Sequence, residues 1–393
     1  MTTPILTLLT PGDSSLTSAW SGVPFGLAGG LEEAGVVVHR ESFYPGLTGV
    51  RIRSYSLKAL VRVRRRLPAV ADALLLLHEY IDEWYTKRKV KKACARHGDS
   101  QMNLFVSYTV SSLESDPRPF ALYCDQTYEE LLEKCSTPPH DRRDKRLLDV
   151  QRRNFESARV LFSTSSHCVE HLQRRHPAGT VFPTALYGIN LFGLGDGLET
   201  PLDSKRHSTS IVFVSRMFEE RGADILIQAV ELLHAEGMRS LTLDMVGLKA
   251  RPRWQRPWIN WHGTYSKDDP QEAAQYWRLM KNARLFVMPS RVGPLPGVIR
   301  EAQYVYTPVV SSTAWTAEQL IEDGVTGRLV GRPDPSLYAA VMANLINDDD
   351  MWTRLAVGGH AVASRETWGS VGRTMRDVLW PAPADERPTG TAP

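Results

Sequence analysis

The sequence has few cysteines and no long apolar run. Its cysteines are isolated and none forms a Cys-x-x-Cys pair: Cys94, Cys124, Cys135 and Cys168. This scatter disfavours both a zinc site and a disulfide framework. No stretch approaches the roughly twenty apolar residues that a membrane-spanning helix needs. The short apolar run near the N-terminus has no basic segment before it, so we predict a first strand and a cytoplasmic protein.

Two hydrolase motifs are also absent, since the chain contains neither Gly-x-Ser-x-Gly nor His-Glu-x-x-His. The formal net charge is only +3 over 393 residues, but residues 51–96 hold 13 Lys/Arg against 4 Asp/Glu. Most of this excess lies in the runs at 62–66 and 87–92. It indicates either a solvated helix face or contact with an anionic partner, such as an acidic membrane surface or an acidic acceptor. We expect no nucleic-acid partner, because no recognised nucleic-acid module accompanies the charge.

Short apolar runs alternate with amphipathic segments, a pattern typical of parallel sheets covered by helices on both faces. In the first half we expect strands at residues 5–9, 35–40, 73–79, 103–108, 120–124 and 158–163. In the second half we expect them at residues 210–215, 241–247, 258–263, 284–290, 308–312 and 327–330. The length suits two domains. The sequence therefore predicts two doubly wound α/β domains, whose ligands bind at the carboxyl ends of the strands.

Several segments, in order, resemble the retaining GT-B glycosyltransferases of family four, which transfer sugars from nucleotide-sugar donors. They are "ARVLFSTSSHCVEHLQRR" with "YGIN", then "IVFVSRMFEERGADILIQAVELL", "LTLDMVG", "INWHGTYSKDDPQEAAQYWRLMKNARLFVMPSR" and "YTPVVSSTAWTAEQLIEDGVTGRLV". The resemblance covers nearly all of the second domain and the end of the first. It implies two Rossmann-like domains facing a central cleft.

The resemblance also suggests how the chain is divided. Residues 1–190 would form the acceptor domain and residues 191–364 the nucleotide-sugar domain. A last helix over residues 365–380 would cross back to the first domain, as it does in the family. Residues 381–393 are rich in proline and poor in apolar side chains, so we predict a disordered tail.

Two arginines are candidates for binding the donor diphosphate. Arg216 ends a predicted strand and Arg221 precedes the next helix, at the places where the resembled family has an Arg and a Lys. A departing diphosphate gathers negative charge, and fixed cations aimed at it stabilise that charge. The alternative is that both arginines form surface ion pairs with Glu219 and Glu220.

The stretch "PSRVGPLPGVIREA" follows a predicted strand and is broken by glycines and prolines. Prolines cannot donate, so Gly293, Leu295, Gly297 and Val298 would offer main-chain N–H groups to the phosphate and sugar. By resemblance, Glu301 is the second Glu of the family's Glu-seven-Glu motif and would hold the ribose, since a carboxylate can accept two hydroxyl hydrogen bonds. Its alternative role is a favourable charge at a helix N-terminus.

The first Glu of that motif is absent, because Gly293 takes its place and Pro294-Leu295-Pro296 replaces the usual Gly-Phe-Gly. This departure implies a donor sugar with different hydroxyls, a carboxylate supplied from elsewhere in the chain, or lost activity.

Further candidates lie elsewhere in the chain. Ser21 and Gly22 follow the first strand, where the family places glycines against the donor phosphate. Asp125 follows another strand and would orient or deprotonate the acceptor hydroxyl, or else it caps the helix that begins near Tyr128. Glu318 matches a family Glu near the donor.

The sequence thus predicts a retaining glycosyltransferase that needs no metal and no cofactor, with a nucleotide-sugar and a glycosyl acceptor as its partners. The acceptor would be a surface glycan, a lipid or a secondary metabolite, and the Ala-, Arg-, Gly- and Pro-rich composition is typical of a high-GC bacterium. Two alternatives stay open. One is an inactive sugar-nucleotide-binding partner subunit, and the other is a peripheral membrane enzyme that acts on lipid-linked acceptors. The oligomeric state is not predicted.

Overall fold

The computed structural model describes residues 3–43, 68–107, 116–134, 142–176, 180–195, 202–292, 296–313 and 317–381. By its internal contacts the chain divides into two compact units. Unit 1 comprises residues 1–188 and 368–393, and unit 2 comprises residues 189–367. Three predicted features lie outside the described residues: the basic run at 62–66, the loop residues Gly293 and Leu295, and the tail from residue 382.

Unit 1 is built on a five-stranded parallel sheet in the order β2-β1-β3-β4-β5. Its strands are β1 (Ile5–Thr10), β2 (Val37–Ser42), β3 (Met102–Phe105), β4 (Phe120–Cys124) and β5 (Val160–Ser163). Every residue of β3, β4 and β5 is buried. Both faces of a parallel sheet are covered, so continuous apolar runs become strands of this kind.

One predicted strand is wrong. Residues 73–79 form part of α3 (Pro68–Arg96), a helix of 29 residues. The run that suggested a strand contains Ala and Leu, which favour helix, and no β-branched residue. No glycine or proline interrupts the chain between Pro68 and Gly98, so nothing ends the helix early.

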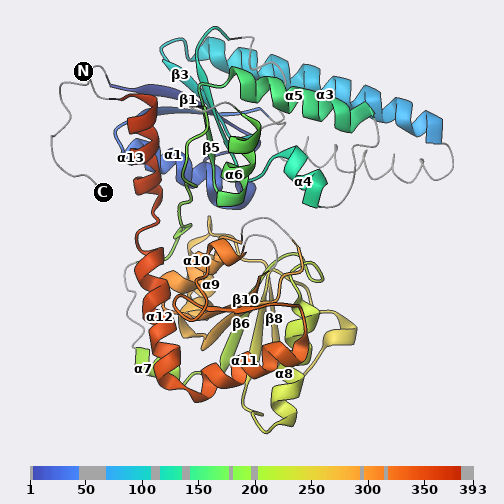
Figure 1. Ribbon diagram of the computed structural model, residues 1–393, viewed down its shortest axis with the longest axis vertical. Helices are drawn as coiled ribbons and strands as arrows, with labels where there is room; N and C mark the ends of the chain where they lie inside the picture. Colours follow the sequence, from blue (N-terminus) through green and yellow to red (C-terminus); the bar gives the residue numbers. More distant parts are fainter. Residues whose placement is uncertain are drawn as a thin grey trace. The chain divides into compact units, whose positions relative to one another are not determined.

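The remaining helices of unit 1 are α1 (Val23–Glu33), α4 (Tyr128–Lys134), α5 (Arg142–Ser157), α6 (Ser166–Arg175) and α13 (Trp368–Leu379). The last of these packs along α1, although the two are at opposite ends of the sequence (Figure 1). Glycines make the close approach possible. A Cβ on Gly30 would lie 2.0 Å from the main-chain oxygen of Trp368, and one on Gly372 would lie 1.9 Å from the oxygen of Gly30.

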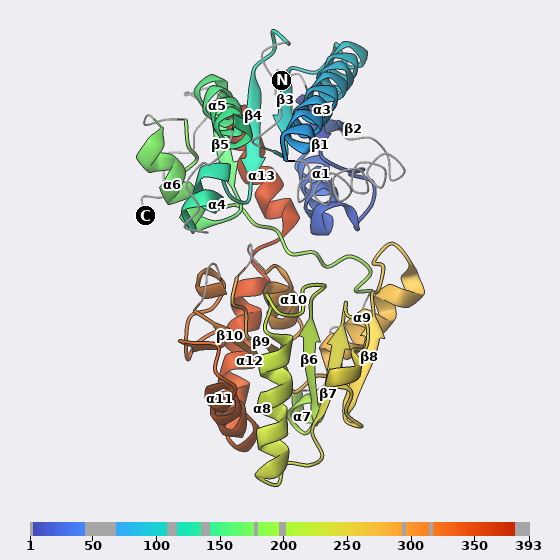
Figure 2. The ribbon, with the colours of Figure 1, turned by 90° about the vertical axis from the view of Figure 1, so that its right-hand side faces the viewer.

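Unit 2 has a six-stranded parallel sheet in the order β11-β10-β9-β6-β7-β8. Its strands are β6 (Ser210–Val214), β7 (Thr242–Val246), β8 (Ile259–Gly263), β9 (Leu285–Met288), β10 (Val309–Ser312) and β11 (Arg328–Val330), and the arrows of β6, β7 and β8 can be followed in Figure 2. The strand order reverses between β6 and β9, which is where open α/β sheets bind their ligands. The predicted α/β class and doubly wound topology are therefore confirmed.

Helices cover the sheet of unit 2. They are α7 (Leu202–Arg206), α8 (Ala223–Ala235), α9 (Pro270–Asn282), α10 (Val298–Tyr304), α11 (Pro335–Asn347) and α12 (Asp349–Ala363). The contacts of α8 with α11, and of α10 with α12, pair these helices over the sheet, and the core between helices and strands is one continuous cluster. Across the described ranges of both units, every helix is too short or too polar to traverse a bilayer.

Candidate functional site

Three loops of unit 2 touch one another at the carboxyl edge of its sheet. Gly222, between β6 and α8, has a φ of +74°, and a Cβ there would lie 2.0 Å from the main-chain oxygen of Pro289, just after β9. Gly247, after β7, has a φ of +88°, and its Cβ would lie 2.4 Å from the oxygen of Ser215. Only glycine permits both the backbone conformation and the contact. The ends of β6, β7 and β9 are thereby held together.

Arg221 lies within this junction and is buried, with 8% of its surface exposed. Its guanidinium donates a hydrogen bond of 3.4 Å to the hydroxyl of Ser290, from the loop after β9. Burial lowers the pKa of Arg221 to about 10, and the charge of Glu220 partly opposes that shift. The side chain still carries its charge at neutral pH. A cation withdrawn from water in this way is stabilised by an anion that binds beside it.

Arg216 is exposed at the end of the same strand, and within the described residues no hydrogen bond or ion pair holds its side chain. The alternative that the two arginines form surface ion pairs with Glu219 and Glu220 is wrong for Arg216. Glu219 instead pairs with Arg251 at 2.5 Å. Among the described residues Arg216 pairs with neither carboxylate, whereas Arg221 is buried and is influenced by the charge of Glu220. The Arg216 guanidinium can therefore turn toward a ligand without breaking a contact.

A further arginine, which the sequence analysis missed, fixes the loop that carries Arg221. Arg291 follows β9, and its guanidinium makes two hydrogen bonds of 2.8 Å to the carboxylate of Asp224, in the first turn of α8. Its main-chain N–H donates to the oxygen of Glu220 at 2.8 Å. Arg291 thus joins the loop after β9 to the loop after β6. Its position directly after the "PS" that ends a predicted strand was the signal that could have identified it.

Glu301 lies in α10 and is buried, with 6% exposed. One carboxylate oxygen, Oε2, accepts a hydrogen bond of 2.5 Å from the hydroxyl of Tyr276 and pairs with the amine of Lys267 at 2.8 Å. Burial lowers the pKa of the Lys267 amine, and Glu301 opposes that shift. Among the described residues nothing donates to the other oxygen, Oε1. Glu301 is more than a charge at a helix end, and Oε1 remains available to a hydroxyl.

Lys267 and Tyr276 were also missed by the sequence analysis. The Lys267 amine lies 4.6 Å from the ring centre of Tyr276 and 4.8 Å from that of Trp277, within cation–π range. It also donates to the main-chain oxygen of Asn190 at 3.1 Å. Lys267 follows β8, so its place after a buried strand could have suggested it. Tyr276 lies within α9 and carried no such signal.

The other predicted residues of unit 2 are placed as follows. Gly297 caps α10 with a right-handed φ of −53°, so no left-handed conformation requires a glycine there. Val298 begins that helix. Glu318 is exposed in a short 3₁₀ turn (Ala317–Gln319) that follows β10. All three follow the carboxyl ends of β9 or β10, whereas Gly293 and Leu295 lie outside the described residues.

In unit 1, Asp125 directly follows β4 at the carboxyl edge of its own sheet. The alternative that it caps α4 is wrong, because Thr127 has that role. The Thr127 hydroxyl accepts from the N–H of Glu130 at 2.9 Å, and the Glu130 carboxylate accepts from the N–H of Thr127 at 3.4 Å. This is a capping box. Burial raises the pKa of the Asp125 carboxyl, and Glu130 adds to the shift. A raised pKa favours proton transfer near neutral pH.

Ser21 and Gly22 lie in an unusual turn between β1 and α1. Three consecutive residues have left-handed φ values, which are +45° at Trp20, +57° at Ser21 and +83° at Gly22. Such values cost free energy for residues other than glycine, and they gather at functional sites in proteins. The turn lies at the same carboxyl edge as Asp125. The structure thus brings these predicted residues of unit 1 to one edge of its sheet.

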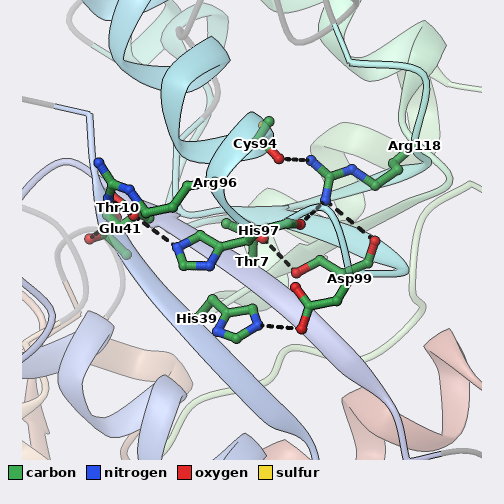
Figure 3. Close-up of polar contacts among 10 residues, drawn as sticks. Thr7, Thr10, His39, Glu41, Cys94, Arg96, His97, Asp99 and Arg118 are labelled. Carbon is green, nitrogen blue, oxygen red and sulfur yellow. Dashed lines mark hydrogen bonds and ion pairs between the residues drawn. The ribbon is translucent and has the colours of Figure 1, made fainter.

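A separate group of titratable residues lies beside β2 in unit 1 (Figure 3). His39, His97 and Asp99 place three groups that could bind a metal within 4.8 Å of one another. The two imidazole rings stack 4.3 Å apart with 12° between their planes. The lone pair of an imidazole nitrogen lies in the plane of its ring, so stacked rings do not point at a common ion. Each ring contacts a carboxylate instead, Asp99 at 3.1 Å and Glu41 at 2.9 Å.

Part of the chain is similar in sequence to known proteins. Residues 208–348 match the family model described as Glycosyl transferases group 1. A D-inositol 3-phosphate glycosyltransferase of Xylanimonas cellulosilytica is 31% identical over 191 residues, which are 47% of this chain and 44% of that protein. One of the same name from Corynebacterium kroppenstedtii is 30% identical over 44% of this chain and 40% of that protein. The chain thus spans about half the length of the curated relatives it matches.

Solved structures match over nearly the whole chain. Anabaena Alr3699/HepE in complex with UDP has a TM-score of 0.65 at 16% identity, covering 96% of this chain and 99% of that one. Sucrose-phosphate synthase from Thermosynechococcus elongatus has a TM-score of 0.68 at 15% identity, covering 96% and 98%. Identities this low show the fold alone. The chain has the GT-B fold, and its residues 208–348 are similar to the glycosyl transferases group 1 family.

Proposed function

We propose that this chain is a glycosyltransferase that moves a sugar from a nucleotide-sugar donor to an acceptor hydroxyl. The observation that carries the proposal is the buried, charged Arg221 at the carboxyl edge of β6, together with Arg216 in the same loop, whose side chain no described residue pairs with. A diphosphate is the ligand that two such cations suit best. The family match over residues 208–348 and the names of the relatives support the same activity.

On this proposal, unit 2 holds the donor. Arg216 and Arg221 bind the diphosphate. The free Oε1 of Glu301 accepts a hydroxyl of the ribose, while Lys267 and Tyr276 hold Oε2 in place. Glu318 and the main-chain groups of Gly297 and Val298 lie nearby in the chain and are further candidates for donor contacts. Anabaena Alr3699/HepE, which has a similar fold, was solved in complex with UDP-glucose, so donors that carry uridine are the first to test.

The proposed reaction keeps the anomeric configuration and uses no metal and no cofactor. The bond between the sugar's anomeric carbon and the diphosphate oxygen breaks, and the acceptor oxygen bonds to that carbon on the same face. The acceptor proton passes to the departing diphosphate, whose added negative charge the two arginines stabilise. Asp125 in unit 1 is proposed to orient the acceptor hydroxyl, which belongs to a glycan, a lipid or a secondary metabolite.

A second candidate is a partner subunit that binds the nucleotide-sugar without turning it over. Gly293 motivates it, because the sequence has glycine where the resembled family has its first motif Glu. Loss of that carboxylate would remove a contact to the sugar and leave the diphosphate and ribose contacts in place. The two candidates therefore differ in turnover and agree in donor binding.

The test is a thermal-shift screen of UDP-, GDP-, ADP- and TDP-sugars, paired with mass-spectrometric detection of donor hydrolysis. Arg216→Ala is the diagnostic variant, because its side chain is exposed and makes no hydrogen bond or ion pair with the described residues. Arg239→Ala, another exposed arginine of unit 2, is the matched control. We expect one donor to stabilise the native protein and the control, with slow hydrolysis, and a weaker effect in Arg216→Ala.

The other outcomes separate the alternatives. Stabilisation without hydrolysis, even with candidate acceptors added, would favour the binding subunit. If no donor stabilises the protein, or if Arg216→Ala responds like the native chain, the assignment of the diphosphate site is wrong.

A further inference from the structure

Helix α3 of unit 1 carries a row of exposed apolar side chains. Leu74 is 42% exposed, Leu77 53%, Tyr80 63%, Ile81 55% and Trp84 52%. Their spacings of three and four residues place them on one side of the helix. Most apolar residues of this size are buried in a folded protein, whereas exposed patches of them mark interaction sites. We call the side of α3 that bears these residues the α3 face.

The α3 face continues along the helix into basic residues. Within residues 87–92, every Lys and Arg is exposed: Lys87, Arg88, Lys89, Lys91 and Lys92. Arg88, Lys91 and Lys92 continue the row at spacings of three and four residues beyond Trp84, so they lie on the same side as the apolar row. The Arg88 guanidinium lies 5.4 Å from the centre of the Trp84 ring. Among the side chains of α3 that the structure describes, Glu83 is the one carboxylate, and it pairs with Lys87 and Arg146.

The opposite side of α3 is already occupied. Thr86, Val90, Ala93 and Cys94 are buried, and Val90, Ala93 and Cys94 belong to the apolar core of unit 1. The side of the helix that faces the sheet is therefore fixed by packing. The α3 face cannot turn inward without exposing this core.

Polar contacts also fix the C-terminal end of α3 (Figure 3). Arg118 donates to the main-chain oxygens of Cys94 at 2.7 Å and of His97 at 2.5 Å. The Cys94 carbonyl is one of those that the end of a helix leaves without an intrahelical partner, and His97 directly follows the helix. Arg96 and His97 both contact the carboxylate of Glu41 on β2. The end of the helix is thus attached to the sheet, which sets the direction in which the α3 face points.

We infer that the α3 face binds the surface of a membrane that contains anionic lipids. Leu and Ile side chains can insert among the acyl chains, Trp and Tyr favour the headgroup level, and Lys and Arg attract anionic headgroups. The apolar row and the basic row follow one another along the helix. The apolar row therefore inserts into the membrane–water interface, while the basic row remains among the headgroups.

A second copy of the chain fits the α3 face less well. Parallel pairing would bring the basic rows of two helices together, and antiparallel pairing would set Lys91 and Lys92 of each copy against apolar residues of the other. An anionic surface satisfies both rows at once. The inference does not rest on the proposed glycosyl transfer, and its test measures binding without any donor or acceptor.

The test is co-sedimentation of the full chain with vesicles of phosphatidylcholine, with and without phosphatidylglycerol. We expect binding to the anionic vesicles at low salt, weakening as sodium chloride is added, and little binding to phosphatidylcholine alone. In Leu77→Ser/Ile81→Ser/Trp84→Ser, partitioning should fall by about tenfold or more, since three inserted side chains are lost. In Lys91→Gln/Lys92→Gln it should fall several-fold, and the salt dependence should become weaker.

Matched controls lie in unit 2. Leu232→Ser/Leu337→Ser/Val357→Ser replaces three exposed apolar residues on other helices, and Arg239→Gln/Arg354→Gln removes two exposed charges. Both should bind vesicles like the native chain. Circular dichroism should show all variants folded, because the replaced side chains are exposed.

Three results would overturn the inference. The native chain could ignore anionic vesicles at low salt, or the Leu77/Ile81/Trp84 variant could bind as well as the native chain. Alternatively, the native chain could form a concentration-dependent dimer that this variant abolishes, with no vesicle binding, which would assign the α3 face to a second copy.

Discussion

The amine of Lys267 and the carboxylate of Glu301 form an ion pair of 2.8 Å, with the amine against the rings of Tyr276 and Trp277. Both side chains are largely withdrawn from water, at 17% and 7% exposed. Either single variant, Lys267→Met or Glu301→Gln, leaves the partner buried without its counterion. We expect each to lower the free energy of unfolding by about 3–5 kcal/mol.

The double variant Lys267→Met/Glu301→Gln checks this explanation. It leaves no unpaired buried charge. Its loss of free energy of unfolding, measured in urea, should therefore be much smaller than the sum of the losses in the two single variants. Simple additivity would show that the two groups are not coupled. Donor-induced stabilisation should be weakened in Glu301→Gln and in the double variant, since both lack the carboxylate proposed to hold the ribose.

Adjacent glycines of α1 offer a sharp comparison. Gly30→Ala would place a Cβ 2.0 Å from the main-chain oxygen of Trp368, so α13 must shift, and we expect a loss of about 1–3 kcal/mol or more. At Gly29 a Cβ would meet nothing within 4 Å. Gly29→Ala should therefore raise the free energy of unfolding by about 0.5–1 kcal/mol, because alanine favours helix. Equal effects of the two variants in urea unfolding would contradict this packing.

The Asp116–Arg118 pair predicts acid sensitivity of unit 1. Hydrogen bonds from Arg118, at 2.8 Å and 2.6 Å, lower the pKa of Asp116 to about 2. An unfolded Asp has a pKa of about 3.9. The depressed native pKa contributes about 2 kcal/mol of stability that is fully present above about pH 4 and disappears as the pH falls through about 2. Urea unfolding at a series of pH values measures this contribution.

Asp116→Asn is the control for the pH series. Its unfolding free energy should be lower than that of the native chain at neutral pH, and it should decline less between about pH 4 and pH 2. If the free energy of unfolding of Asp116→Asn falls between about pH 4 and pH 2 as steeply as that of the native chain, other carboxyl groups cause the acid sensitivity.

Asp125 and Thr127 lie two residues apart, but we expect their substitution to affect different properties, kcat for Asp125 and stability for Thr127. Asp125→Asn should reduce kcat at least tenfold with little change in stability, if the carboxyl orients or deprotonates the acceptor. Since burial raises the pKa of Asp125, the acid limb of the native pH–rate profile should lie above the usual Asp range and disappear in the variant. Thr127→Ala should leave kcat unchanged and cost about 1 kcal/mol of stability, because it removes the cap of α4. The reverse pattern would make Asp125 structural.

Most of the sheet could be predicted from the sequence, because strands buried on both faces must be apolar throughout. The runs around Val212 and Phe286 are examples. The failure at residues 73–79 has the same origin, since a short apolar run fits a strand and a helix equally well. What decides there is the absence of a chain break before Gly98, together with the helix propensity of Leu and Ala.

The candidate site was predictable where a residue's position in the chain fixes its place. Arg216 and Asp125 follow strands, so they lie at a carboxyl edge in any parallel sheet. Residues that contact the site from the middle of a helix were harder to predict. Tyr276 reaches Glu301 from the middle of another helix, and only packing brings the two together. The Thr127–Glu130 capping box, by contrast, is visible in the sequence as Thr-x-x-Glu and should have displaced Asp125 as the predicted cap.

The ends of unit 2 are joined to each other. The N–H of Ile189 donates to the main-chain oxygen of Glu366 at 2.9 Å, so the first and last segments of this unit lie side by side. In unit 1, Gly188 and Trp368 are likewise in contact, because a Cβ added to Gly188 would lie only 2.3 Å from the indole ring. In the sequence, unit 2 is thus one continuous insertion between the two segments of unit 1, and its first and last residues are neighbours in space. Folding can therefore complete unit 2 before the last helix is made, whereas unit 1 must wait for residues 368–379 to cover α1.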